Sequence, residues 1–391
     1  MTEKAINQNQ ETEVIRGLEG VVAAETDISF VDGVHGDLYY KGYNIHEIAD
    51  HTTSYVEVVY LLLNGDLPTR QELKKFRRKI VSEMRVPTQV IKMMEIMPPS
   101  SHPMDVLRAS VSALSFFDTD AKDNSPEASR RKGIRIIAQI PTLVASLYRI
   151  RKHKMILSPD PGLNMAENIL YMFHGEVPED LHARAMDQLL LLHADHGLNA
   201  STFAARVAAS THADIHAAVT AALATLKGPL HGGANERVMK MLRKINNIDE
   251  VEEYINSMLA QGQRVMGFGH RVYIKEDPRA RHLRKMSEEL CRQSENKNLY
   301  KISHKIEGIV LEAKGIYPNV DFYSATVQNA IGIPSDFYTA IFAASRISGW
   351  VAHVLDQYDN NRLIRPTSKY TGEYNRHFVP VKERSGNKKQ S

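Results

Sequence analysis

Apolar residues recur at the spacing of amphipathic helices along most of the chain. Residues 250–265 and 279–293 carry this pattern and are predicted to be helices. Residues 183–226 are rich in alanine, with larger apolar residues at intervals, and small side chains let neighbouring helices approach closely. We therefore predict a mainly α fold with closely packed core helices in this stretch.

Strand-like alternation is confined to one short segment. Residues 28–44 alternate and contain the turn-forming pairs Asp32-Gly33 and Gly36-Asp37, which predict a small N-terminal β-hairpin. The chain shows neither an internal repeat nor the strand–helix alternation that a parallel sheet requires. Helices are therefore expected to dominate the rest of the fold.

Several helix ends can be predicted from their side chains. Thr69-Arg70-Gln71-Glu72 is a capping box, which marks the start of a helix. Gly65 follows an apolar stretch and is expected to end the helix before it. The last long helix is expected to begin after Pro334, with Ser335 as its N-cap, and to run to about Tyr358.

Composition narrows the functional classes. The 391 residues are enough for about two domains, and 43% hydrophobic with 24% charged residues is typical of a globular protein. A net charge of +3 is small for this length and does not favour nucleic-acid binding. The single cysteine, Cys291, allows no internal disulfide and fits a reducing compartment.

Targeting and membrane signals are weak. Residues 1–8 lack an apolar core and carry an acidic residue early, unlike a secretory signal or a transit peptide. The longest apolar run, Val58-Val59-Tyr60-Leu61-Leu62-Leu63, is too short to span a bilayer. These features predict a soluble cytoplasmic protein.

Three short blocks carry most of the candidate chemistry. They are Gly228-Pro229-Leu230-His231-Gly232-Gly233-Ala234-Asn235-Glu236, Met266-Gly267-Phe268-Gly269-His270-Arg271-Val272-Tyr273 and Pro318-Asn319-Val320-Asp321. Each places one histidine or carboxylate on a segment built of glycine, proline or asparagine. Two histidines and an aspartate can serve as general acids and bases. Arg279, in Asp277-Pro278-Arg279, adds a guanidinium that suits a carboxylate substrate.

Two of these groups allow a structural role as well as a catalytic one. Asn235 is a candidate N-cap for a helix whose positive end would keep His231 neutral and able to donate a hydrogen bond. The alternative is a loop histidine that bonds only backbone. Asp321 has apolar neighbours that would keep it partly dry and make it a better base. Alternatively, it is the N-cap of the helix that follows.

The segment before His270 and the side chain of Arg346 also allow two interpretations each. The glycines before His270 do not form a dinucleotide-binding motif, because Val272 stands where the last glycine is required. They either let a ligand approach the backbone or form a structural turn. Arg346 lies within an apolar helix, between Phe342 and Trp350, and a buried guanidinium requires an anion. That anion is either an internal carboxylate or a substrate carboxylate.

A metal site is an alternative interpretation of two histidines. His193 and His196 are three residues apart, so both could face one side of a helix and bind a metal. With Asp321 they would form the site of a metal hydrolase. No His-Glu-x-x-His motif is present, and no third ligand is indicated nearby.

Taken in order, the three blocks and Asp277-Pro278-Arg279 resemble citrate synthase, in its short prokaryotic-type form. The resemblance extends from about residue 16 to Glu383. It implies a two-domain helical fold: residues 1–231 and 332–391 would form a large domain, and residues 232–331 a small domain that closes over the active-site cleft. It also implies a homodimer that packs through the large domains.

The resemblance also implies residue roles. Asp321 would remove a proton from the methyl group of acetyl-CoA, His231 would bond the thioester oxygen, and His270 would polarise the ketone of oxaloacetate. The residues implied to bind oxaloacetate are His196, Arg279, Arg346, Arg365 from the partner subunit and, on a loose local match, Arg85. The residues expected to bind coenzyme A are Arg264, Val265, Met266, Gly267, Phe268, Arg271, Lys275 and Lys314.

The implied reaction is a condensation followed by hydrolysis of citryl-CoA, with no metal and no tightly bound cofactor. The closest alternative is 2-methylcitrate synthase, which uses propionyl-CoA on the same scaffold. The segments His193-Ala194-Asp195-His196 and 357–366 look more like the citrate enzymes. A non-catalytic helical protein would be expected to have lost the acid and base residues, yet all three are present.

Overall fold

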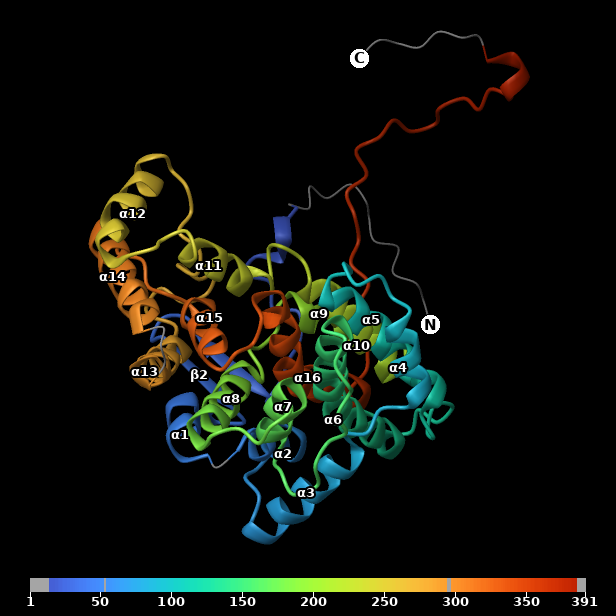
Figure 1. The fold of residues 1–391 in the computed structure, drawn as a ribbon. Helices are drawn as coiled ribbons and strands as arrows, with labels where there is room; N and C mark the ends of the chain where they lie inside the picture. The colour runs from blue at the N-terminus through green and yellow to red at the C-terminus, as the bar shows by residue number, and fades with distance from the viewer. Residues whose placement is uncertain (1–13, 53, 294–296, 385–391) are drawn as a thin grey trace. The chain divides into compact units, whose positions relative to one another are not determined.

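The computed structural model describes residues 14–52, 54–293 and 297–384, and within these residues the chain is mainly helical (Figure 1). The helices are α1 Ile45–His51, α2 Tyr55–Asn64, α3 Arg70–Glu83, α4 Thr88–Glu95, α5 Pro103–Leu114, α6 Pro126–Arg151, α7 Met165–His174, α8 Asp180–His193, α9 Ala200–Ser210, α10 Ile215–Leu226, α11 Ala234–Leu242, α12 Val251–Ala260, α13 Pro278–Gln293, α14 Lys297–Lys314, α15 Val320–Ala330 and α16 Tyr338–Asp359. The strands are β1 Ser29–Asp32, β2 Asp37–Tyr40 and β3 Tyr43–Asn44. Short 3-10 turns are η1 Arg16–Leu18, η2 Ser115–Phe117, η3 Ile248–Glu250, η4 Ser335–Phe337 and η5 Val381–Glu383.

The predicted hairpin is confirmed, with a short third strand added. β1 pairs antiparallel with β2, from Ser29 opposite Tyr40 to Asp32 opposite Asp37, and β3 pairs with β2. The Tyr40 side chain is fully buried, and its hydroxyl donates to the Asp195 carbonyl oxygen at 2.9 Å. The sheet is thereby anchored to the segment that follows α8.

Two predicted helix ends are confirmed. The Thr69 hydroxyl and the Glu72 carboxylate form the reciprocal bonds of a capping box at the start of α3. Gly65 ends α2 in the left-handed conformation, with φ +91°, and its N–H donates to the Leu61 carbonyl. Both ends depend only on adjacent residues, which explains why sequence reasoning found them.

Three other predicted ends are wrong. Ser335 does not cap the last helix, because Ser335–Phe337 form the 3-10 turn η4 before α16 begins at Tyr338. Asn235 lies inside the first turn of α11, which Gly233 precedes. The helix predicted over 250–265 stops at Ala260 in α12, because Gly262 adopts the left-handed conformation with φ +66°.

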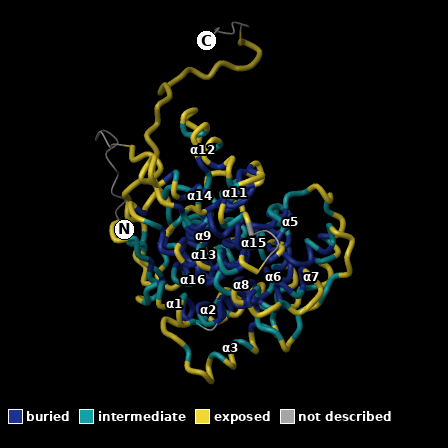
Figure 2. Tube along the Cα trace, turned by 60° about the vertical axis from the view of Figure 1, so that its left-hand side comes forward, coloured by how far each residue is buried: buried dark blue, intermediate teal, exposed yellow. Residues whose placement is uncertain are grey.

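Helix α16 is the centre of the core. Every residue from Tyr338 to Val354 is buried, Trp350 completely (Figure 2). The alanine-rich stretch forms most of α8 together with α9 and α10, and all three pack against α16, as does α6. The prediction of closely packed helices in this stretch is therefore confirmed.

Helices α11 to α15 pack chiefly against one another and also contact α8 and α16. Residues 26–363 form one compact unit, so the division at residues 232 and 331 stays a prediction. Residues 1–25 and 364–391 form a second unit, whose described residues are exposed except for Ala24 and Ile364, which are half-buried. Among the described residues, no helix is long and apolar enough to cross a membrane.

The contact between α6 and α16 gives a stability prediction. A Cβ added at Gly133 in α6 would lie 2.5 Å from Cγ1 of the buried Val351 in α16. Gly133→Ala should therefore lower the free energy of unfolding by about 1–3 kcal/mol, as overpacking of a core does. Urea unfolding followed by circular dichroism measures the change.

Gly308 in α14 provides a matched control, because a Cβ there meets nothing within 4 Å. Gly308→Ala should stabilise the protein by up to about 1 kcal/mol, the usual gain from replacing an exposed helical glycine. Equal effects of the two substitutions would contradict the close packing of α6 against α16.

Candidate active site

Backbone pairing brings the second and third motif blocks together. Phe268 forms a β-bridge with Pro318, the Asn319 N–H donates to the Gly267 carbonyl at 2.9 Å, and the Gly269 N–H donates to the Tyr317 carbonyl at 3.0 Å. Gly267 has φ +82°, and a Cβ there would lie 2.9 Å from the Phe322 side chain. The glycine is therefore required for the close approach that places His270 beside the start of α15.

The protonation state of His270 follows from its backbone contacts. Its Nδ1 accepts hydrogen bonds from the N–H groups of Val272 and Tyr273 at 3.0 and 3.1 Å. An accepting Nδ1 places the ring proton on Nε2. Burial, assisted by the charge of Arg279, lowers the His270 pKa to about 4. The ring is thus neutral at physiological pH and can donate from Nε2.

His196 lies against His270, with ring centroids 5.2 Å apart, and its Nε2 is 3.1 Å from the Tyr273 hydroxyl. Burial and the charge of Arg279 lower its pKa well below the usual value. The prediction that His193 and His196 share one helix face is wrong, because α8 ends at His193. Within the described part of the chain, no group of three or more His, Cys, Asp or Glu side chains could hold a metal ion.

Arg279 forms a buried, two-point ion pair with Asp277. Its Nε and Nη2 donate to the two carboxylate oxygens at 2.9 and 2.8 Å. The Asp277 carboxylate also accepts the N–H of Val320 at 3.1 Å, which ties this pair to the third block. The pair fixes the guanidinium plane while Nη1 makes no hydrogen bond to any described residue.

Arg346 is buried with no carboxylate oxygen within 4 Å among the described residues. Its Nε donates to the His193 carbonyl at 2.6 Å, and its guanidinium lies over the Phe342 ring, 4.8 Å from the centroid. Burial lowers its pKa to about 10, and the negative charge of Asp195 opposes that shift. Of the two predicted counter-ions for Arg346, an internal carboxylate in direct contact is therefore not observed among the described residues.

His231 is held through a serine that sequence reasoning missed. His231 Nε2 lies 2.8 Å from Ser201 Oγ, which also accepts the indole N–H of Trp350 at 3.1 Å. Burial and the charge of Arg346 lower the His231 pKa to about 4. The Ser201 proton can be donated to His231 or to Asn199, whose side-chain oxygen lies 2.8 Å away.

Asp321 is in the first turn of α15, and Asn319, not Asp321, is the N-cap of that helix. Its Oδ1 is buried and has no hydrogen-bond partner among the described residues. Burial raises the pKa of Asp321 to about 7, although Arg279 and Arg346 oppose the shift. A carboxyl group that titrates near neutral pH suits a general base.

The two arginines link these groups electrostatically. The charges of Arg279 and Arg346 both act on the pKa values of Asp321 and His196. In addition, Arg346 acts on His231 and Arg279 acts on His270. The structure therefore gathers the predicted acid, base and guanidinium groups of residues 196–346 around one positively charged centre.

Other predicted residues lie at the surface or outside this cluster. Arg85 is exposed after α3, and its carbonyl accepts a hydrogen bond from Gln139 at 3.1 Å. Among the residues predicted to bind coenzyme A, Arg264, Arg271, Lys275 and Lys314 are exposed, Val265 and Gly267 are buried, and Met266 and Phe268 are half-buried. Arg365 is exposed in the unit formed by the chain ends.

Sequence reasoning also missed Asp277 and the hydroxyl of Tyr273 as contacts of the site. Asp277 could have been found from the sequence, because an aspartate directly before a proline is typical of a helix start. In the structure its Oδ1 accepts the Arg279 N–H at the start of α13. Ser201 carries no such signal, since it lies 30 residues from His231.

Comparisons with known proteins identify the family of this chain. The family model described as citrate synthase, C-terminal domain, matches residues 17–367. The chain belongs to the citrate synthase family. Its relatives in that family include "Citrate synthase 2" of Bacillus subtilis, 46% identical over 371 residues, which cover 95% of this chain and 99% of the relative.

Two further family members bear on the substrates. "Citrate/2-methylcitrate synthase" of Bacillus subtilis is 41% identical and matches 91% of this chain and 96% of its own length. The solved ternary complex of citrate synthase from Thermoplasma acidophilum with carboxymethyl coenzyme A and oxaloacetate superposes with a TM-score of 0.90. It is 36% identical and matches 95% of this chain and 100% of that chain.

The raised pKa of Asp321 predicts a pH-dependent cost in stability. The folded carboxyl group holds its proton up to about pH 7, whereas in the unfolded chain it loses it near 3.8. Stability is therefore lost as pH rises from about 4 to 7. Asp321→Asn stays neutral and should therefore unfold at a higher temperature than the natural protein at pH 8. The corresponding gain in the free energy of unfolding is no more than about 4 kcal/mol.

Scanning calorimetry at pH 5 and pH 8 measures this difference, which should shrink at the lower pH. Asp249→Asn, at an exposed carboxylate, is the matched control and should change stability by less than about 0.5 kcal/mol. A stability gain at Asp321 that is the same at both pH values would show that the charge is not its cause.

Proposed function

We propose that this protein is a citrate synthase that condenses acetyl-CoA with oxaloacetate and hydrolyses the citryl thioester to citrate and free CoA. The observation that carries the proposal is the cluster of one buried carboxyl group with a raised pKa and neutral histidines around two buried arginines. Membership of the family supports it.

Asp321 takes the proton from the methyl carbon of the acetyl thioester. This proton is very weakly acidic, so the base needs help from a donor at the thioester oxygen. His231 supplies that donor, and one well-placed hydrogen bond to the developing oxyanion is worth about 3–4 kcal/mol. When Ser201 donates to His231 Nε2, the ring proton is on Nδ1, the position free to bond the thioester oxygen.

The resulting enolate attacks the ketone carbon of oxaloacetate. The His270 Nε2–H, fixed by the two backbone bonds to Nδ1, polarises the ketone oxygen and supplies a proton to the new alkoxide. Arg279 and Arg346 bind the carboxylates of oxaloacetate, and His196 donates to the same substrate. Binding this anion provides Arg346 with the counter-charge that the described chain does not place beside it.

Coenzyme A is proposed to lie along the segment Arg264–Phe268, where two exposed cations nearby, Arg271 and Lys275, suit its phosphates. Lys314, exposed at the end of α14, is a third candidate. The contact of Arg85 with oxaloacetate rests on the resemblance alone. The chemistry of this site uses charged and neutral protein side chains and requires no metal.

We also propose the assembly and the moving parts that the family implies. Residues 232–331 would close as a small domain over the cleft, with residues 1–231 and 332–391 as the large domain. Two copies would form a homodimer in which Arg365 of one chain reaches the oxaloacetate of the other. We place the protein in the cytoplasm.

A second candidate substrate is propionyl-CoA, which would make the protein a 2-methylcitrate synthase. The similarity to a "Citrate/2-methylcitrate synthase" supports this alternative. One additional methylene changes binding in a pocket by only about 1–3 kcal/mol, so both acyl groups can be accepted by one site.

The test is release of free thiol from acetyl-CoA and from propionyl-CoA, with and without oxaloacetate and in the presence of EDTA. Release that requires oxaloacetate and favours acetyl-CoA supports the proposal. A clear preference for propionyl-CoA would change the substrate and leave the residue roles intact. No release from either thioester would refute the function.

The pH dependence tests the base. Since Asp321 must be ionised, kcat/KM for acetyl-CoA should rise with pH through a single step near pH 7. The histidines lose their protons near pH 4 and should add no step between pH 5 and 9. Asp321→Asn should lower kcat by about 10²–10⁴-fold. A rate independent of pH from 5.5 to 8.5 would contradict the assignment.

A further inference from the structure

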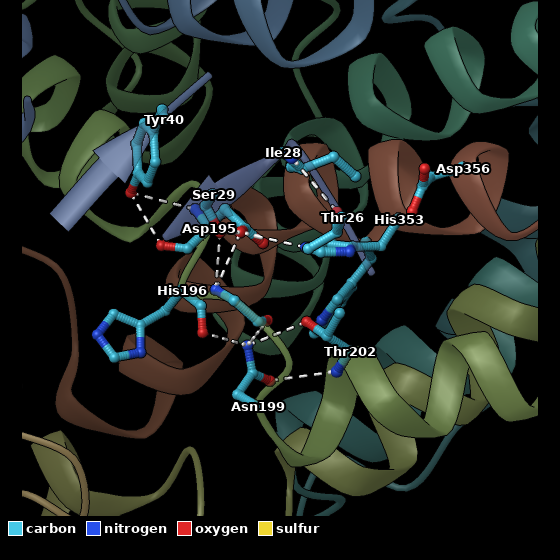
Figure 3. A network of polar contacts seen from close by, with 12 residues as sticks. Thr26, Ile28, Ser29, Tyr40, Asp195, His196, Asn199, Thr202, His353 and Asp356 are labelled. Carbon is cyan, nitrogen blue, oxygen red and sulfur yellow. Dashed lines mark hydrogen bonds and ion pairs between the residues drawn. The ribbon is translucent and has the colours of Figure 1, made fainter. Parts of the chain in front are cut away.

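Asp195, directly before His196, is a buried carboxylate to which the proposed mechanism gives no role (Figure 3). We propose that Asp195 is a positioning residue for oxaloacetate binding: its buried carboxylate fixes the loop that carries His196 and lies against α16 one turn from Arg346. This inference rests on the proposed function and extends it to a residue that touches no substrate.

One oxygen of the Asp195 carboxylate gathers three donors. Oδ2 accepts from the Ser29 hydroxyl on β1, from the Gly197 N–H at 3.0 Å and from His353 Nε2 at 3.3 Å (Figure 3). These donors come from the hairpin, from the loop itself and from α16. The carboxylate therefore holds three separate elements at the position next to His196.

In the contact with His353, the ring is the hydrogen-bond donor. Arg206 Nη1 can only donate, and it lies 3.3 Å from His353 Nδ1, so the ring proton is on Nε2 and points to Asp195. Arg206 is itself paired with Asp356 at 2.6 Å. Asp195 thus keeps its negative charge, and the charge on Arg206 is matched by another carboxylate.

The backbone on either side of the carboxylate is fixed as well. The Tyr40 hydroxyl donates to the Asp195 carbonyl at 2.9 Å and accepts the Asp195 N–H at 3.2 Å. The carbonyl of Ala194 accepts the Gly349 N–H from α16 at 3.1 Å. A residue that is bonded at both its main-chain groups and its side chain leaves His196 little freedom to move.

The second oxygen, Oδ1, faces α16. It is buried with no hydrogen-bond partner among the described residues, and it lies 2.2 Å from where a Cβ on Gly349 would stand. Gly349 is three residues after Arg346 on the same helix. The negative charge of Asp195 opposes the lowering of the Arg346 pKa by burial. Charge and shape thus both connect Asp195 to the guanidinium that binds the substrate.

The primary test is Asp195→Asn, which preserves shape and removes the charge. Isothermal calorimetry with oxaloacetate alone and steady-state kinetics should both be measured. We expect oxaloacetate to bind at least tenfold more weakly and its KM to rise to the same extent, while the KM for acetyl-CoA changes less than twofold. A general loss of structure would instead affect both substrates.

Asp356→Asn is the matched control, because it makes the same chemical change in the carboxylate that pairs with Arg206 rather than in the one next to His196. It should leave the KM for oxaloacetate within twofold of the natural value. Gly349→Ala should also weaken oxaloacetate binding without altering any charge, since the new methyl group would lie 2.2 Å from Oδ1 and 2.6 Å from the Ala194 carbonyl oxygen and would displace the loop. If either variant does not fold, Ser29→Ala, which removes one donor, should raise the KM for oxaloacetate about threefold to fivefold.

Unchanged oxaloacetate affinity in folded Asp195→Asn would overturn the inference, and so would an equal loss in Asp356→Asn. Failure of the proposed function gives a different result. The natural protein would then bind oxaloacetate and release no thiol, or would not bind oxaloacetate at all.

Discussion

The site depends on two guanidinium groups that the fold buries near one another. Arg279 is matched by Asp277, whereas Arg346 rests on the His193 carbonyl and an aromatic ring. A buried charge without a carboxylate beside it is costly, and in the proposed function a dianionic substrate removes that cost on binding. Burial, assisted by these positive charges, lowers the pKa values of the neighbouring histidines and keeps their rings neutral.

Rigid backbone pairing gives these charges their geometry. The bridge between Phe268 and Pro318 fixes two loops against each other, and the neighbouring backbone N–H groups determine which nitrogen of His270 carries the proton. A ring whose tautomer is fixed by main-chain donors needs no reorganisation when charge develops on the substrate. The irregular segments around Phe268 and Pro318 thus carry the groups proposed to act on the substrate, and helices α15 and α16 hold these segments in place.

This arrangement reduces stability at the points where it serves function. Asp321 and Asp195 each bury an oxygen that has no partner among the described residues. An unsatisfied buried acceptor costs about 1–3 kcal/mol, which the packing around α16 must offset. The surrounding core holds the Asp321 and Asp195 side chains in place despite this cost.

The sequence by itself determined the mainly helical fold, the hairpin, the capping box at Thr69 and the three motif blocks proposed to carry the chemistry, since each depends on a few adjacent residues. Helical spacing also predicted that Arg346 is buried, which the structure confirms, and that it needs an anion, which stays a prediction. Sequence reasoning misplaced the cap at Ser335, because a 3-10 turn and a helix start carry the same local signal. Only the tertiary structure decided that Ser201 holds His231 and that Asp321 titrates near pH 7. Hydrogen-bond partners and pKa values depend on groups that packing brings together from distant parts of the chain, and no local pattern specifies them.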